Sequence, residues 1–161
     1  MLKRVLSQLN FKSLLDLIGF CLRYPRPMLF TAMATKKCMA MCDAAYGKTH
    51  HLNNRANAVR HGLWSILIVK RLTRAKITRD RALAWAKKIT DWHEDFSVNA
   101  PLERAMDLHN NAIGRSLYNE LGQFTELEIL KRLKAKAVTA IPVVSIRQIE
   151  SQRVEFVYLN P

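Results

Sequence analysis

Apolar residues recur at helical spacing along most of this chain, and residues that start or stop helices separate the apolar runs. The residues expected to begin the later helices are Asn53 or Asn54, Thr78, Asn99 with Pro101, and Thr125. At the last of these positions the letters TELE supply a capping box. The pattern therefore predicts four helices after residue 52, the first three ending near residues 72, 96 and 122.

The first 45 residues carry two further amphipathic segments with basic side chains. In the first, apolar residues stand at positions 2, 5, 6, 9, 11, 14, 15, 18 and 22, which is helical spacing. Lys12 and Asp16 interrupt this stripe, so it is too polar to span a bilayer and unlike a secretory signal peptide. Pro25 and Pro27 end it, and a second helix runs to about Tyr46. Such a helix pair either lies on an anionic membrane or packs over the rest of the domain.

The C-terminal part of the chain changes character. Residues 141–159 are rich in β-branched and aromatic residues on either side of a polar Glu150-Ser151-Gln152 turn, which predicts a short hairpin. The expected fold is mainly α, a compact bundle of about five to six helices with a short C-terminal β-hairpin. The length of 161 residues suits a single domain. Its expected parts are a basic helical segment (1–46), a motif-bearing core (53–121), and a final helix plus hairpin (125–161).

The chain is strongly basic, with 26 Lys and Arg against 13 Asp and Glu and a net charge of +13. Residues 1–50 carry 8 basic and 2 acidic side chains, 51–100 carry 10 and 4, and 101–161 carry 8 and 7. Because the excess lies in the first hundred residues, the expected partners of that region are anionic: a membrane surface, a phosphate-containing substrate, nucleic acid or an acidic protein.

Three cysteines, at positions 21, 38 and 42, form no closed disulfide set, which fits a reducing compartment. Cys38 and Cys42 share a helix face, and we expect two small buried side chains there rather than a metal or redox pair. The expected location is cytoplasmic or peripheral to a membrane, or outside the cell by export without a recognisable signal peptide.

Three polar clusters interrupt the apolar helices: NAVRHGLW at 57–64, WHEDF at 92–96 and MDLHNNAIGR at 106–115. Core helices rarely aim His, Asp, Asn and Arg inward, because an unpaired buried polar group costs about 1 to 3 kcal/mol. The clusters therefore indicate either an internal hydrogen-bond network or a site that binds a metal or a substrate.

Helical geometry predicts how the clusters meet. At about 100° per residue, His61 and His93 each lie on the inward stripe of their helix, and Glu94 lies about a quarter-turn to the side of His93. Asp107 aligns with Asn111 on the third helix, whereas His109 points away from Asp107. We expect His61, His93 and Asp107 to face one cavity, with Asn110 or Asn111 close by.

Two imidazoles and a carboxylate from three helices suit a divalent metal ion such as zinc or manganese. The predicted ligands are His61, His93 and Asp107, with His109 as the alternative ligand. The other predicted roles are Glu94 as general base together with His93 and Asp107 in the catalytic centre, Arg60 and Arg115 as holders of an anionic group, and Asn57, Asn110, Asn111 and Trp64 as substrate contacts. The alternative is a rigid buried network without a ligand.

The joint pattern resembles an uncharacterised bacterial domain family, whose motifs are Asn-Ala-x-Arg-His-x-x-Trp, a His-Glu pair, and Met-Asp-Leu-His-Asn-Asn-x-x-Gly-Arg. The resemblance covers roughly residues 53–121 and implies a mainly helical fold with a shared polar centre. The matching positions are Asn57, Arg60, His61, Trp64, His93, Glu94, Asp107, His109, Asn110, Asn111, Gly114 and Arg115. More distantly, DLHNN is similar to the Asp-x-His segment of helical zinc-dependent phospholipases C and nucleases. This chain has only five histidines, and two of them are the adjacent His50 and His51 of a polar loop.

These observations lead to a leading functional hypothesis and two alternatives. The first is a metal-assisted hydrolase that acts on an anionic, phosphate-containing substrate such as a phospholipid or phosphodiester. The second is a non-enzymatic helical binding module, in which the polar centre is structural and the basic face binds an anionic membrane, nucleic acid or an acidic protein. The third is a toxin-like effector that acts on nucleic acid.

Overall fold

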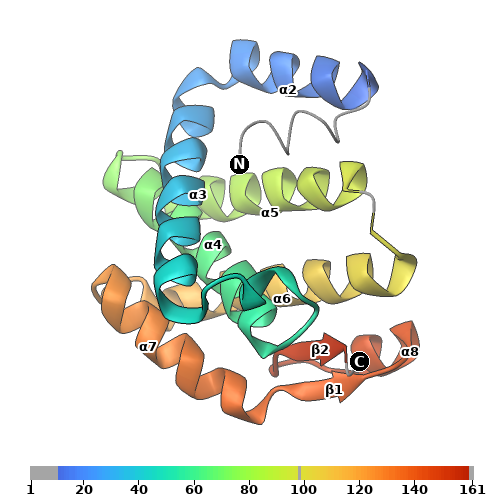
Figure 1. Ribbon diagram of the computed structural model, residues 1–161. Helices are drawn as coiled ribbons and strands as arrows, with labels where there is room; N and C mark the ends of the chain where they lie inside the picture. The colour runs from blue at the N-terminus through green and yellow to red at the C-terminus, as the bar shows by residue number, and fades with distance from the viewer. Residues whose placement is uncertain (1–10, 98, 160–161) are drawn as a thin grey trace.

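A computed structural model describes residues 11–97 and 99–159, which form a mainly helical domain (Figure 1). The helices are α2 (Phe11–Arg23), α3 (Pro25–Tyr46), α4 (Arg55–Arg74), α5 (Arg79–Phe96), α6 (Pro101–Leu121), α7 (Glu126–Lys136) and α8 (Ile146–Ser151). The short elements are the 3-10 turns η1 (Thr49–His51) and η2 (Ala137–Thr139) and the strands β1 (Ile141–Val143) and β2 (Val157–Leu159). The mainly α architecture predicted from the sequence is confirmed. The expected apolar positions 2, 5, 6 and 9 lie outside the described residues.

The helix boundaries follow local capping chemistry. The side chain of Asn54 accepts hydrogen bonds from the amides of Ala56 and Asn57, which begins α4 where the sequence predicted. Thr125 and Glu128 form the predicted capping box of α7. Pro25 stands in the first turn of α3, where a missing amide hydrogen costs nothing.

Helix α4 is the centre of the domain, because it packs against α3, α5, α6 and α7. Its residues from Ala56 to Leu72 are mostly buried, on nearly every side of the helix. The first two helices are arranged around it differently. Helix α3 packs on α4 through a buried stripe that includes Ala34, Cys38 and Cys42, and both of these cysteines are free. Helix α2 lies at the edge of the molecule beside α5 (Figure 1).

Helices α4 and α6 cross at two glycines. A Cβ atom built on Gly114 would lie 2.5 Å from the carbonyl oxygen and 2.6 Å from the Cα of Gly62. A Cβ on Gly62 would in turn lie 2.6 Å from the ring of Phe156, which is fully buried. Only glycine permits this close backbone approach. It brings the part of α4 around Gly62 against the part of α6 that leads to Gly114.

The C-terminal segment differs from the predicted hairpin. Strands β1 and β2 run parallel, with Ile141 opposite Val157, and α8 connects them. The physical reason is that the side chain of Ser145 caps a new helix by accepting from the amide of Gln148, so the chain makes a helical crossover where a tight turn was expected. This short helix also brings the described α-helices to seven, one more than the range expected.

The outer edge of β2 is closed by side-chain and backbone groups instead of a third strand. The side-chain amide of Asn110 donates to the carbonyl oxygen of Val157 at 2.9 Å and accepts from its amide at 3.0 Å. The amide of Leu159 donates to the carbonyl oxygen of Asn53 at 2.8 Å. Asn110 therefore takes the place of a neighbouring strand and ties β2 to α6.

No helix in the described part of the chain is long and apolar enough to cross a bilayer.

Candidate metal centre

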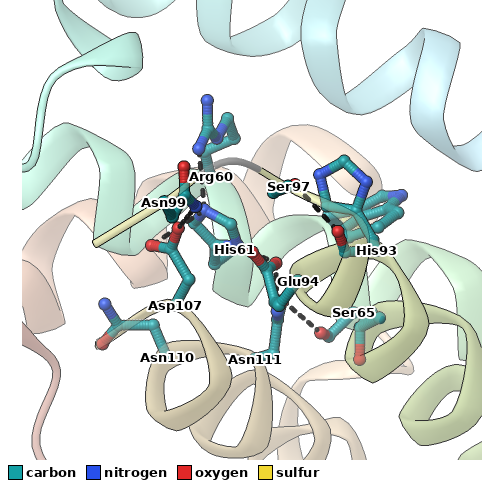
Figure 2. A network of polar contacts seen from close by, with 12 residues as sticks. Arg60, His61, Ser65, His93, Glu94, Ser97, Asn99, Asp107, Asn110 and Asn111 are labelled. Atoms are coloured by element: carbon teal, nitrogen blue, oxygen red, sulfur yellow. Dashed lines mark hydrogen bonds and ion pairs between the residues drawn. The ribbon is translucent and has the colours of Figure 1, made fainter. Parts of the chain in front are cut away.

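His61 of α4, Glu94 of α5 and Asp107 of α6 converge between the three helices (Figure 2). His61 Nδ1 lies 3.6 Å from Glu94 Oε1, and His61 Nε2 lies 3.2 Å from Asp107 Oδ1. One potential ligand atom from each residue lies within 4.8 Å of the other two. The side chains are 3%, 1% and 5% exposed, so the centre is one imidazole and two carboxyl groups shielded from bulk solvent.

Neighbouring polar groups hold both carboxyl groups in place. Asn111 donates to Glu94 Oε1 at 3.1 Å, and the hydroxyl of Ser65 donates to Asn111 Oδ1 at 3.2 Å. On the other side, Asn99 donates to Asp107 Oδ2 at 3.4 Å. Supporting hydrogen bonds of this kind fix the orientation of ligands in metal centres and also stabilise purely structural networks.

Arg60 lies between the buried centre and a more exposed histidine. One guanidinium nitrogen lies 2.7 Å from His61 Nε2, and the other lies 3.4 Å from Nδ1 of His51. A guanidinium only donates, so Nε2 of His61 accepts, and a neutral imidazole then carries its proton on Nδ1. The contact of Nε2 with Asp107 Oδ1 is therefore between two acceptors whenever Asp107 is ionised.

Several atoms of the centre lack hydrogen-bond partners among the residues that the structure describes. These atoms are Nδ1 of His61 and Oδ1 of Asp107, together with Oδ1 of Asn57, which lies one turn before His61 on α4. Buried polar atoms without partners are costly, at about 1 to 3 kcal/mol each. Two of the three belong to the converging group. The unpaired Oδ1 of Asp107 fits a site that a cation completes, whereas Nδ1 of His61 would have to lose its proton before it could bind one.

Burial also shifts the ionisation of the centre. It raises the pKa of Glu94 to about 8, with the charge of Asp107 as the second cause. It raises the pKa of Asp107 to about 7, which Arg60 partly opposes, and it holds the pKa of His61 well below its usual value. Without a cation, the interior therefore favours an uncharged imidazole and protonated carboxyl groups near neutral pH. A divalent ion reverses this preference, because it compensates two carboxylate charges.

His93 does not join His61 and Asp107 in this group, and Glu94 stands there instead. The ring of His93 meets the indole of Trp64 edge-on at 5.1 Å and points away from His61 and Asp107 (Figure 2). The reason is that α5 has two inward faces. Trp92 packs against Phe20 of α2, whereas Thr90 and Glu94, one turn apart, face α6. The prediction that His93 faces the centre was based on the aromatic stripe of α5. The polar stripe that carries Glu94 lies on a different side of the helix.

The remaining predicted residues have other partners. Nε2 of His109 lies 2.8 Å from the carbonyl oxygen of Glu155, so His109 faces the C-terminal segment, as Asn110 does. Arg115 donates to Thr90 at 3.0 Å, two turns along α6 from Asp107. The indole of Trp64 donates to Thr35 of α3 at 2.8 Å. Of the predicted substrate contacts, Asn111 is therefore the one hydrogen-bonded to the centre itself.

Sequence reasoning missed two supports of the centre. Ser65 follows His61 by four residues, the spacing that places two side chains on one helix face, and this spacing was the available signal. Asn99 was expected to open α6, but Ala100 occupies that capping position and the Asn99 side chain reaches back to Asp107. Nothing in the local sequence indicates that contact.

A second group of potential ligands lies near the surface. His50 Nε2 is 2.9 Å from Asp43 Oδ1, and the rings of His50 and His51 are 4.1 Å apart. Asp43 and His51 are exposed, whereas His50 is completely buried. His51 contacts Arg60, so this group is connected to the buried centre through one guanidinium.

The fold and the centre define a class of protein: a mainly helical domain in which three central helices bury one histidine and two carboxylic acids. The chain belongs to the family described as Domain of unknown function (DUF6973), whose model matches residues 18–141. The match includes all three residues of the converging group. No protein of curated function and no solved structure matches the chain.

Proposed function

We propose that His61, Glu94 and Asp107 bind a divalent metal ion, and that the protein uses it to hydrolyse an anionic, phosphate-containing substrate. The observation that carries the proposal is the convergence of three ligand groups from three helices, with ligand atoms within 4.8 Å of one another and an unpaired buried oxygen on Asp107. One imidazole and two carboxylates are natural ligands for zinc or manganese. Three protein ligands leave coordination positions for water and substrate, as in catalytic metal sites.

The charges around the centre support an anionic substrate. A divalent ion supplies a Lewis acid and lowers the pKa of bound water. Arg60 is only half-buried and His51 is exposed, so an anionic group that approaches from solvent meets these two side chains before the ligands. A planar guanidinium suits a phosphate group, and Arg60 already lies 2.7 Å from His61.

A structural network is the second candidate, and the deep burial of the three side chains favours it. The two candidates differ in what Asp107→Asn does. An asparagine keeps the shape of the side chain and one acceptor oxygen for Asn99, so a structural network tolerates it at a cost of about 1 kcal/mol. A metal centre loses a charged ligand, and we expect a loss of affinity for the ion of about a hundredfold or more.

The test is the metal content of the purified protein after dialysis against zinc or manganese. We expect about one ion per chain at the proposed three-ligand centre, and a loss of that ion in Asp107→Asn. The matched control is Asp80→Asn, the same chemical change at a side chain that is 85% exposed and paired with Arg79 on the surface. A folded wild-type protein that binds no ion, or an Asp107→Asn protein that binds as wild type does, would refute the metal centre.

The hydrolase is tested separately with bis(4-nitrophenyl) phosphate, a simple phosphodiester. We expect metal-dependent turnover that Glu94→Gln reduces by about 10² to 10⁴, because the change removes a carboxylate that serves as ligand or base. Full activity of Glu94→Gln would exclude Glu94 from that role. One bound ion without turnover of phosphate esters would refute the hydrolase and leave the metal centre in place.

A further inference from the structure

The outer side of α2 is apolar, although it faces solvent. Leu15, Ile18 and Leu22 follow one another at helical spacing and are 52%, 46% and 79% exposed. The opposite side attaches the helix to the domain through Phe20, whose ring meets Trp85 and Trp92 edge-on at 6.0 and 5.5 Å. No described element covers the outer side of α2 (Figure 1). A helix whose sole role is to close over the domain would carry polar residues there.

The first half of α3 also carries exposed apolar side chains. Leu29 and Met33 lie one turn apart and are also exposed. Exposed apolar side chains that stand singly are common on proteins, but a group of them on one face of a helix, as on α2, marks an interaction site. Tyr24 is the one residue between α2 and α3. The exposed apolar residues of the two helices are therefore close in the sequence.

Basic side chains flank this surface. The basic residues of α2 and α3 are Lys12, Arg23, Arg26, Lys36 and Lys37, all exposed. Lys37 is paired with Glu126 of α7, whose carboxylate lies 3.7 Å away, so it adds no net charge to this surface. The acidic residues of the two helices are Asp16 and Asp43, and Asp43 lies at the far end of α3, where it is paired with His50. Close to the apolar surface, the positive charges therefore outnumber the negative ones.

We propose that the outer face of α2 and the first half of α3 form a docking surface for an anionic lipid bilayer. A leucine-rich stripe bordered by Lys and Arg is the chemistry of a helix that lies in the membrane interface, where the leucines enter the acyl boundary and the cations meet anionic headgroups. Helix α2 has 13 residues, and at 1.5 Å per residue it extends about 20 Å, too short for a hydrocarbon core of about 30 Å. The helix therefore lies on the bilayer.

The charge selects a bilayer over a second copy of the chain as the occupant. A symmetric contact between two α2 faces brings Lys12 and Arg23 of one copy close to the same residues of the other, which is repulsive. An anionic bilayer instead offers negative charge over the whole surface. This inference goes beyond the proposed hydrolase and does not depend on the metal centre.

The test is co-sedimentation of the full chain with vesicles of phosphatidylcholine alone or with about 30% phosphatidylserine, a composition chosen for a strongly negative surface. We expect binding to the anionic vesicles, weaker binding to the neutral ones, and a steep decline as the ionic strength rises from about 0.1 to 1 M, where the Debye length falls from about 10 to 3 Å. Lys12→Gln with Lys36→Gln should weaken binding to anionic vesicles by about fivefold per removed charge.

The apolar contribution is tested with Leu15→Glu combined with Leu22→Glu. Glutamate is a good helix former, so α2 should keep its structure, and tryptophan fluorescence checks that Trp85 and Trp92 keep their environment. We expect vesicle binding to fall at least about tenfold, because each leucine loses its transfer into the membrane. The matched control is Val138→Glu with Val144→Glu, two exposed apolar residues near the C-terminal sheet, which should bind as wild type does.

Three results would overturn the proposal. They are unchanged binding of the Leu15 and Leu22 double variant, equal loss in the Val138 and Val144 control, and equal binding to neutral and anionic vesicles. Sedimentation velocity adds a fourth. If the wild-type chain forms dimers that Leu15→Glu with Leu22→Glu dissociates, and the dimers bind no vesicles, the surface is an interface between copies of the chain.

Discussion

The crossing of α4 and α6 offers a sharp test of how the fold positions the metal centre. In Gly114→Ala, the new Cβ atom would lie 2.5 Å from the carbonyl oxygen of Gly62 and 2.6 Å from its Cα. Both of these are backbone atoms, so no side-chain rotation relieves the clash, and the two helices must move apart. Gly62 is the residue after His61, and Gly114 lies two turns after Asp107 on α6. Moving the two helices apart therefore also separates His61 from Asp107.

Two opposing effects decide the magnitude. Replacing a helical glycine with alanine gains about 1 kcal/mol of helix propensity. Overpacking a well-filled core costs about 1 to 3 kcal/mol, and a clash between backbones belongs at the upper end. We therefore expect Gly114→Ala to lower the free energy of unfolding by about 2 kcal/mol, which for a chain of this size lowers Tm by about 4 to 8 °C.

The assay is urea and thermal unfolding followed by circular dichroism, with Gly19→Ala as the control. Gly19 lies inside α2, and a Cβ atom there would meet nothing within 4 Å, so this change should leave stability equal or raise it by up to about 1 kcal/mol. Metal affinity should fall in Gly114→Ala and stay unchanged in Gly19→Ala. A Gly114→Ala protein as stable as wild type would show that the helices separate at little cost, and the reasoning from backbone contact would be wrong.

Two other predictions concern pH and the C-terminal segment. In the metal-free protein, the raised pKa values of Glu94 (about 8) and Asp107 (about 7) mean that the folded state holds protons that the unfolded state has released, so stability should fall as pH rises. The lowered pKa values of His61 and of His93 (about 4) act in the opposite sense, but mainly below the ordinary histidine value of 6.5. Urea unfolding in a chelator should therefore show a net decline between pH 6.5 and 8, which added zinc or manganese reverses. A flat profile in that window would contradict the burial of the two carboxyl groups. Asn110→Ala leaves the amide and carbonyl groups of Val157 unpaired and should lower the free energy of unfolding by about 2 to 4 kcal/mol, measured by urea unfolding, whereas a loss below about 0.5 kcal/mol would mean that water replaces both contacts.

The helices were predictable because their signals are local. Asn54, Thr125 and the prolines of α3 act on backbone groups within a few residues, and apolar residues at helical spacing mark the segments between them. The hairpin was not predictable in the same way. Ser145 caps α8 within a segment rich in β-branched residues, and the parallel pairing of β1 with β2 depends on contacts with α6 that are distant in sequence.

The centre was only partly predictable, and α5 shows why. Periodicity placed His61 and Asp107 on inward stripes of α4 and α6, and these two side chains do lie together. Helix α5 has neighbours on two sides, so its aromatic stripe faces α2 through Trp92 while Glu94 faces the centre. One residue of rotation, about 100°, decides whether a histidine or a glutamate reaches the interior. Which of the two residues faces the centre depends on how α5 packs against its neighbouring helices, and the sequence of α5 alone does not determine this.

The two hydrogen bonds between Asn110 and Val157 bear on how much of the chain the centre needs. The family match stops at residue 141, yet the group that occupies the side chain of Asn110 is Val157, sixteen residues further on. The next residue, Asn111, holds Glu94 at the centre. A protein shortened to the matched region would therefore expose an unpaired amide beside the very turn of α6 that orients the carboxylates. The smallest unit able to keep the centre in order extends through β2.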